Sequence, residues 1–130
     1  MKWLLASIGL IGALTAGASI PQTAAAAARK GGEQCFFARN MTSFAPVGRE
    51  KLNIRVGVND YYQIDLLGTC QDLDWSQRIG LQSRGSDWIC SGLDVTIIVP
   101  SQIGPQRCNA SSIHKLTPAE VAAIPKKEKP

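Results

Sequence analysis

The sequence predicts an all-β, mainly antiparallel fold: a small disulfide-stapled barrel or sandwich of about six strands, with one short C-terminal helix. Short apolar segments are separated by Gly, Pro, Asn and Asp at roughly ten-residue intervals. The pattern contains neither long helical periodicity nor an alternation of strands with helices. Four cysteines accompany these segments. Because a domain of about 100 residues is only marginally stable on its own, two disulfides are expected to hold it together.

Four strands are expected in the first half of the domain, over residues 34–39, 41–47, 51–58 and 61–67. Aromatic content indicates that the first is short and buried, and Pro46 and Gly48 mark a turn after the second. In the third strand, alternate apolar residues share one buried face: Leu52, Ile54, Val56 and Val58. Asn59 and Asp60 tolerate positive φ and predict a tight hairpin before the fourth strand.

Three further strands and one helix are expected in the second half, over residues 78–84, 94–99, 107–116 and 117–124. Residues 72–77 predict a single helical turn before the first of these strands. The helix should begin at Thr117, because Thr117 and Glu120 form a capping box with a proline at the first helical position. Pro125 should end it.

The N-terminal residues predict a secretory signal peptide, with Lys2 before an apolar run that ends at Ile20 and cleavage expected near Ala26. An uncleaved membrane anchor is the alternative, but the run is short and contains three glycines. The expected divisions are a signal peptide (1–26), a flexible linker (27–34), a disulfide-stapled β domain (35–124) and a basic tail (125–130). We therefore expect a periplasmic protein without a transmembrane segment in its mature chain.

All four cysteines lie in the expected mature chain, where export to an oxidising compartment favours disulfides. Four cysteines allow three pairings. We expect Cys70–Cys90, closing a local excursion, and Cys35–Cys108, tying the first strand to the last. A zinc site is the alternative, but the sequence lacks a Cys-x-x-Cys pair and has one histidine, so no metal or cofactor is expected.

The net charge of +4 comes from the chain ends, since residues 35–122 contain eight basic and eight acidic residues. A nucleic-acid interface needs basic residues clustered on the fold, so nucleic acid is not expected as a partner. The basic tail is expected to be solvated, with weak contact to an anionic surface as the alternative.

The order of four motifs resembles a family of small secreted bacterial proteins catalogued only as a domain of unknown function. The motifs are CFF at 35–37, YYQIDLLGTC at 61–70, SGLDVTIIV at 91–99 and KLTPAEVAAI at 115–124, with one cysteine between the last two. The likeness extends from Cys35 to Pro125. It implies a bacterial envelope protein and transfers no catalytic residue.

Candidate chemistry lies between the second and third cysteines. Asp72 and Asp74 could form an acid/base pair or bind calcium. The favoured interpretation is structural, in which Asp72 caps the helical turn and Asp74 pairs with Arg78 four residues on. Trp75 could stack on a sugar or anchor a protein partner, and core and binding roles are equally expected for it. Trp88 is expected in the core.

His114 is the only histidine. It could join Ser111 or Ser112 and an aspartate in a catalytic triad. However, the sequence has no Gly-x-Ser-x-Gly nucleophile elbow, so a structural or exposed histidine is expected.

Three functions are therefore considered. The leading hypothesis is a non-enzymatic binding or structural module of the bacterial envelope that contacts another envelope protein or a glycan through Trp75, Asp72, Asp74 and Arg78. The second is a secreted inhibitor of a hydrolase such as lysozyme, using the loop 100–107, by analogy of size and architecture. The third is a small hydrolase that uses Asp72 and Asp74, or His114. The sequence does not determine the oligomeric state.

Overall fold

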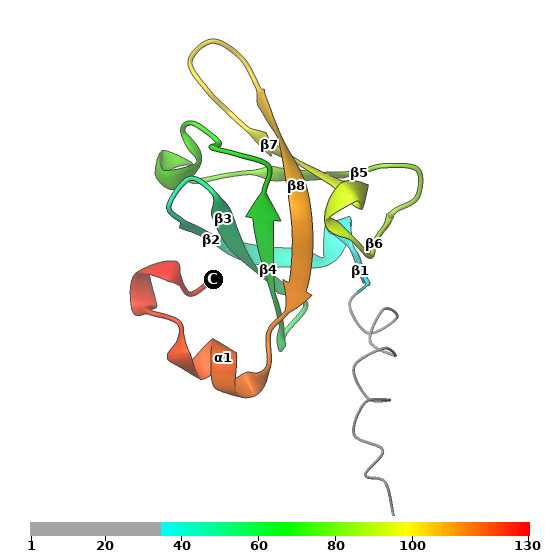
Figure 1. Ribbon diagram of the computed structural model, residues 1–130, viewed down its shortest axis with the longest axis vertical. Coiled ribbons are helices and arrows are strands. Elements are labelled where there is room, and N and C mark those ends of the chain that lie inside the picture. Colours follow the sequence, from blue (N-terminus) through cyan, green and yellow to red (C-terminus); the bar gives the residue numbers. More distant parts are fainter. Residues whose placement is uncertain (1–34) are drawn as a thin grey trace, which may run out of the picture.

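The structure is a computed structural model that describes residues 35–130 (Figure 1). The expected signal peptide (1–26) and linker (27–34) lie outside the described residues. The all-β, antiparallel class is confirmed. A six-stranded sheet of order β2-β3-β4-β8-β7-β5 curls into a half-barrel, and a small sheet pairs β1 with β6. Within residues 35–130, no helix is long and apolar enough to cross a membrane.

The strands are β1 (Phe36–Phe37), β2 (Met41–Val47), β3 (Lys51–Val56), β4 (Asp60–Leu66), β5 (Gly80–Ser83), β6 (Trp88–Ile89), β7 (Val95–Val99) and β8 (Gln106–Lys115). The helix is α1 (Pro118–Ala123), and the short 3₁₀ turns are η3 (Ala38–Asn40), η4 (Leu73–Trp75), η5 (Gly92–Asp94) and η6 (Lys126–Glu128). The elements expected from the sequence are thus present, with β6 and the 3₁₀ turns η3, η5 and η6 as additions.

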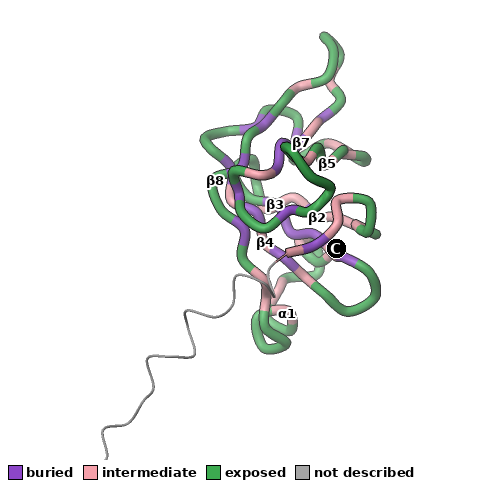
Figure 2. The backbone as a smooth tube through the Cα atoms, turned by 90° about the vertical axis from the view of Figure 1, so that its right-hand side faces the viewer, coloured by how far each residue is buried: buried purple, intermediate pink, exposed green. Residues whose placement is uncertain are grey.

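The core lies on the concave face of the half-barrel. Alternate residues of its strands and of η4 are fully buried: Leu52, Ile54, Ile64, Leu73, Val95, Ile97 and Val99. Buried positions, purple in Figure 2, are concentrated in the strands, whereas the hairpin loops are largely exposed. Truncating one such leucine or isoleucine to alanine costs about 2–5 kcal/mol of stability in a typical core.

The β3–β4 hairpin turns earlier than expected. β3 ends at Val56, and the positive φ that the turn needs is supplied by Gly57 (φ +61°) rather than by Asn59 or Asp60. Val58 therefore belongs to the turn and is 71% exposed. The expectation that Val58 faces the core is wrong, because the alternation of β3 stops two residues before it.

β8 holds the two halves of the large sheet together. Its first half pairs with β7 and its second half with β4. Within the pairing with β4, between Ala110 and Ser112, Ser111 is an extra residue, a β-bulge that bends the strand and lets the sheet curl. Gly92 of η5 packs directly on this bulge: a Cβ there would lie 2.6 Å from the carbonyl oxygen of Ser111, and it would clash with the backbone of Ser112 as well.

The structure contains two disulfides, Cys35–Cys90 and Cys70–Cys108. The expected pairs, Cys70–Cys90 and Cys35–Cys108, are wrong, and strand register explains why. Phe36 of β1 lies opposite Ile89 of β6, so the residue before β1 faces the residue after β6, and their Cα atoms are 4.1 Å apart. The short strands β1 and β6 were too weak a pattern to reveal this pairing.

The second disulfide follows from the pairing of β4 with β8. Leu66 lies opposite Ala110, and the backbone N–H of Leu67 donates to the carbonyl of Asn109 over 2.8 Å. The chain leaving β4 therefore runs beside Cys108 and brings Cys70 to it. Both sulfurs of this bridge belong to buried residues, whereas Cys90 is exposed.

The C-terminal helix has the expected capping box. The side chain of Thr117 accepts from the backbone N–H of Glu120 over 3.2 Å, and the Glu120 carboxylate accepts from the N–H of Thr117 over 2.7 Å. The sequence predicts a solvated tail after this helix, but the tail also contacts the sheet. The side-chain amide of Asn53, which is buried in β3, donates to the carbonyl of Glu128 in η6 over 3.0 Å. The tail thus satisfies a buried polar side chain on the convex face of the sheet.

Candidate functional site

An open groove of about 830 Å³ lies between η4 with the segment after it and the loop that joins β7 to β8. Its lining residues are Asp72, Trp75, Ser76, Gln77 and Arg78 on one side, and Pro100, Ser101, Gln102 and Ile103 on the other. Three of the four binding residues suggested by the sequence are therefore together in one groove, and the loop proposed for an inhibitor forms its opposite wall. In Figure 1 this loop projects from the top of the sheet.

Trp75 and Ile103 give the groove its apolar character. Trp75 is 77% exposed and Ile103 is 99% exposed. Leu73, two residues before Trp75, is fully buried and anchors η4 in the core. Because the short turn directs Leu73 inward, Trp75 is left facing solvent. Of the two roles equally expected for Trp75, this exposure excludes the core.

The acidic residues of this segment are arranged differently from the expectation. Asp74 lies outside the groove lining, and its carboxylate is 3.4 Å from Nε of Arg49 rather than paired with Arg78. Arg78 therefore has no carboxylate within ion-pair distance among the described residues. Asp72 stands at the start of η4 as expected, but its backbone is left-handed (φ +61°). Among the described residues, its side chain makes no cap hydrogen bond.

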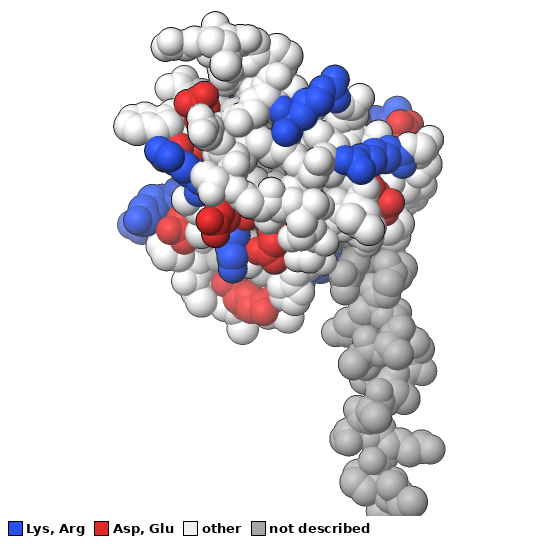
Figure 3. Space-filling model, turned by 45° about the horizontal axis from the view of Figure 1, so that its top comes forward, with Lys and Arg blue, Asp and Glu red and all other residues white. Residues whose placement is uncertain are grey.

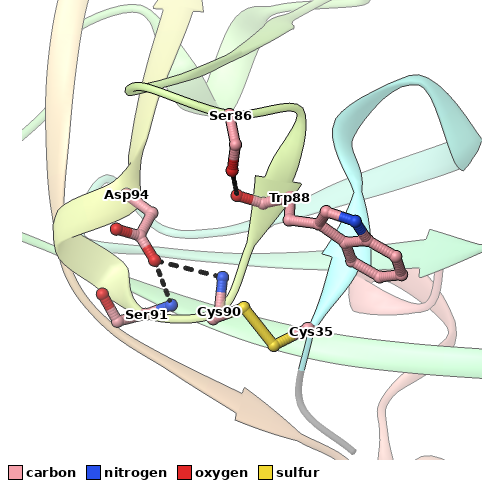
Figure 4. Close-up of a disulfide and its surroundings, with 6 residues drawn as sticks. All are labelled: Cys35, Ser86, Trp88, Cys90, Ser91 and Asp94. Atoms are coloured by element: carbon pink, nitrogen blue, oxygen red, sulfur yellow. Dashed lines mark hydrogen bonds between the residues drawn. A yellow bond between two sulfur atoms is a disulfide. The ribbon is translucent and has the colours of Figure 1, made fainter. Parts of the chain in front are cut away.

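Trp88 is not part of the core, contrary to the expectation. It is 46% exposed, and its ring lies 3.8 Å, centroid to centroid, from that of Phe37 on the outside of the β1–β6 pair. Because β6 turns Ile89 inward, the strand alternation turns Trp88 outward. Figure 4 shows the indole beside β1, away from the disulfide.

The segment after β6 fixes the exposed disulfide. The Asp94 carboxylate accepts from the backbone N–H of Ser91 over 2.9 Å and of Cys90 over 3.2 Å (Figure 4). These hydrogen bonds to the charged form, first that of Ser91, lower the pKa of Asp94 below its usual range. The ionised carboxylate thus holds the backbone at Cys90 in the position that meets Cys35.

The candidate catalytic residues do not come together in one place. His114 lies near the α1 end of β8, 3.2 Å from the Glu120 carboxylate, whereas η4 lies toward the opposite end of the sheet (Figure 1). The backbone N–H of Thr117 and then His114 lower the pKa of Glu120. Ser112 donates to Asp65 over 2.8 Å, and within residues 35–130 no hydrogen bond joins it to His114.

Among residues 35–130, no three His, Cys, Asp or Glu side chains form a group that could hold a metal ion.

The structure also reveals a pair of arginines that sequence reasoning missed. Arg84 and Arg107 both extend over the convex face of β5, β7 and β8, where their guanidinium groups bond to uncharged side chains. Figure 3 shows acidic and basic side chains close together over much of the view. The alternation of residues along β5 can be seen in the sequence. The register of β5, β7 and β8, which brings Arg107 to the same face as Arg84, cannot.

Comparisons with known proteins find one family. No curated protein and no solved structure matches the chain. A family model described as a family of unknown function, DUF6491, matches residues 1–129. This agrees with the resemblance noted from the four motifs. With nearly the whole length matched, the chain belongs to the family of unknown function DUF6491.

Proposed function

We propose that this protein is a non-enzymatic binding module of the bacterial envelope, exported to the periplasm, and that it binds a glycan in the groove between η4 and the β7–β8 loop. The observation that carries the proposal is the exposure of Trp75 in a groove otherwise lined largely by polar side chains. Large exposed aromatics that are rimmed by polar groups are typical of binding sites.

The groove has the chemistry that sugars require. The flat indole of Trp75 offers an apolar surface for the C–H face of a sugar ring. The carboxylate of Asp72 accepts hydrogen bonds from hydroxyl groups, and the guanidinium of Arg78 and the amide of Gln102 donate them. A few polar groups around an apolar platform fix the orientation of a ligand.

Export is supported by the cysteines. Both pairs are oxidised, and disulfides persist in secreted and periplasmic proteins rather than in the cytosol. A binding rather than catalytic role is favoured because Asp74 is engaged by Arg49 and His114 by Glu120, at sites that do not adjoin. A hydrolase built on Asp72 and Asp74, or on His114, is for this reason the least favoured of the three hypotheses.

Titration calorimetry with two hexasaccharides tests the proposal: neutral N-acetylchitohexaose and acidic hexagalacturonate. We expect Trp75→Ala to weaken binding by about tenfold or more, the range for an aromatic anchor at the centre of an interface. Leu93→Ala is the matched control, because Leu93 is 66% exposed and does not line the groove. Binding of neither sugar, or equal binding by Trp75→Ala and wild type, would contradict the proposal.

The second candidate is an inhibitor of a hydrolase such as lysozyme. Ile103, at the tip of the projecting loop, is almost fully exposed and could enter the active site of an enzyme. Inhibition of lysozyme by the wild type that is lost in Ile103→Ala and kept in Trp75→Ala would favour this candidate over glycan binding.

A further inference from the structure

Two arginines meet over one row of the curled sheet. Gln82 of β5 is opposite Thr96 of β7, and Thr96 is opposite Asn109 of β8. Arg84 donates from Nη2 to Thr96 over 3.1 Å and also to Asn109. Arg107 reaches across β7 from β8 and donates from Nη1 to Gln82. Both guanidinium groups therefore bond to one row of the convex face, Arg84 to Thr96 and Asn109 and Arg107 to Gln82.

This pair carries positive charge that nothing in the described chain neutralises. Five other Lys or Arg residues are each paired with a carboxylate: Arg39 with Asp87, Arg49 with Asp74, Lys51 with Asp65, Lys115 with Asp60 and Lys127 with Glu128. Arg84 and Arg107 bond only to a hydroxyl and two amide oxygens, and among residues 35–130 no carboxylate lies within ion-pair distance of either.

These hydrogen bonds orient both guanidinium groups but leave some of their N–H donors free. A guanidinium has five N–H donors. Arg84 uses Nε and Nη2, and Arg107 uses Nη1, so each keeps N–H groups for a ligand. Both side chains belong to exposed residues. Two like charges held close together by neutral acceptors, with planar donors to spare, suit a carboxylate or another planar anion.

The pair is continuous with the groove. Ile79 and Leu81 pack against the core, so Gly80 and Gln82 of β5 face the convex side. Arg78 lies two residues before this strand and Arg84 directly after it. Arg78 lines the groove. Arg78 and Gln82 are four positions apart, at most about 14 Å of extended chain, a length that a chain of a few sugars can bridge.

We propose that Arg84 and Arg107 form an anion subsite next to the groove, and that the ligand is an acidic polysaccharide whose carboxylate groups contact this pair while a neighbouring sugar stacks on Trp75. The inference rests on the proposed glycan function and names the class of glycan. A nucleic acid is less suited, because a phosphate chain requires a longer row of uncompensated basic residues than these arginines provide.

Binding of hexagalacturonate and of its fully methyl-esterified form, in which every carboxylate is replaced by a neutral methyl ester, tests the subsite. Wild type should bind the acid about tenfold or more tightly than the ester, the effect of one charged hydrogen-bonded contact. Arg84→Gln/Arg107→Gln should lose this preference while still binding the ester like wild type. Arg39→Gln is the matched control, because Arg39 is exposed but paired with Asp87, and it should keep the preference.

Two further readouts secure the interpretation. In ¹⁵N NMR of the wild type, the Nε–Hε signals of Arg84 and Arg107 should shift on addition of the acid and not of the ester. This measurement does not depend on the folding of any variant. Loss of ester binding in Trp75→Ala together with an unchanged acid preference in the arginine variant would overturn the subsite and leave the glycan proposal standing. Binding of N-acetylchitohexaose but of neither galacturonate form would overturn the subsite alone, and binding of none of the three would overturn both proposals. Tighter binding of a single-stranded oligonucleotide than of the acid would replace the polysaccharide.

Discussion

Removing one sulfur at a time tests how the cysteines are paired. Cys70→Ala deletes the bridge to Cys108 and should leave Cys108 as the one reactive thiol, because Cys35 and Cys90 remain joined. With the pairing expected from the sequence, the same change would instead release Cys90. Alkylation of the denatured, non-reduced variant followed by peptide mass spectrometry therefore distinguishes the two arrangements by which cysteine carries the label.

The two disulfides should contribute similar amounts to the unfolding free energy through chain entropy and different amounts through packing. They join residues separated by 55 and 38 positions. In the chain-entropy model, loops of these lengths each stabilise the folded state by about 4 kcal/mol. Cys70 and Cys108 are also buried, so their replacement by alanine removes core volume and costs about 1 kcal/mol more.

We therefore expect Cys35→Ala/Cys90→Ala to lose about 4 kcal/mol and Cys70→Ala/Cys108→Ala about 5 kcal/mol of unfolding free energy. Urea denaturation of both double variants and the wild type, followed by far-UV circular dichroism, measures these losses. A label on Cys90 or Cys35 in the Cys70→Ala variant would refute the pairing. Unchanged urea midpoints in the double variants would refute the energetic argument.

Two further predictions concern a close backbone approach and a helix cap. Gly92→Ala should lower the unfolding free energy by about 1–3 kcal/mol, because its Cβ would meet the backbone of the β8 bulge. Gly80→Ala, whose Cβ would lie 3.5 Å from Ile98, should change the unfolding free energy much less. Urea denaturation of both variants checks this. The folded pKa of Glu120 is lowered, so its contribution is present above the unfolded pKa and is lost as the pH falls through the folded pKa. Glu120→Gln should therefore be less stable than wild type at neutral pH and converge with it in acid, as followed by thermal melting against pH.

Local patterns in the sequence predicted most of the strands, because each strand is specified by its own residues. The alternation of Val95, Ile97 and Val99 produced β7, and the capping box at Thr117 produced α1. Errors arose where a partner strand decides the outcome. Trp88 seemed a core residue from its apolar neighbours, but pairing of β6 with β1 turns it outward against Phe37.

The candidate site was only partly predictable for the same reason. Trp75, Asp72 and Arg78 could be selected from a single segment, because aromatic and charged residues adjoin there. The opposite wall, near Ile103, is brought to them only by the curl of the sheet. The pairing of Arg84 with Arg107 depends on the register of three strands, and a count of charges along the chain shows residues 35–122 as balanced.

The place of β8 in the sheet determines the order in which a growing chain can fold. β2, β3 and β4 pair through short hairpin turns and need only local contacts. β7 and β5 join them only through β8, which spans Gln106–Lys115, late in the sequence. A chain that emerges N-terminus first must therefore keep the apolar side of its first three-stranded meander uncovered until these residues appear. Cys70 has no partner until Cys108 emerges, whereas Cys35 and Cys90 are both present earlier. The order in which the chain emerges thus sets the order in which the disulfides can form. The exposed Cys35–Cys90 bridge can form first, and the buried Cys70–Cys108 bridge can form only when β8, which completes the sheet, is present.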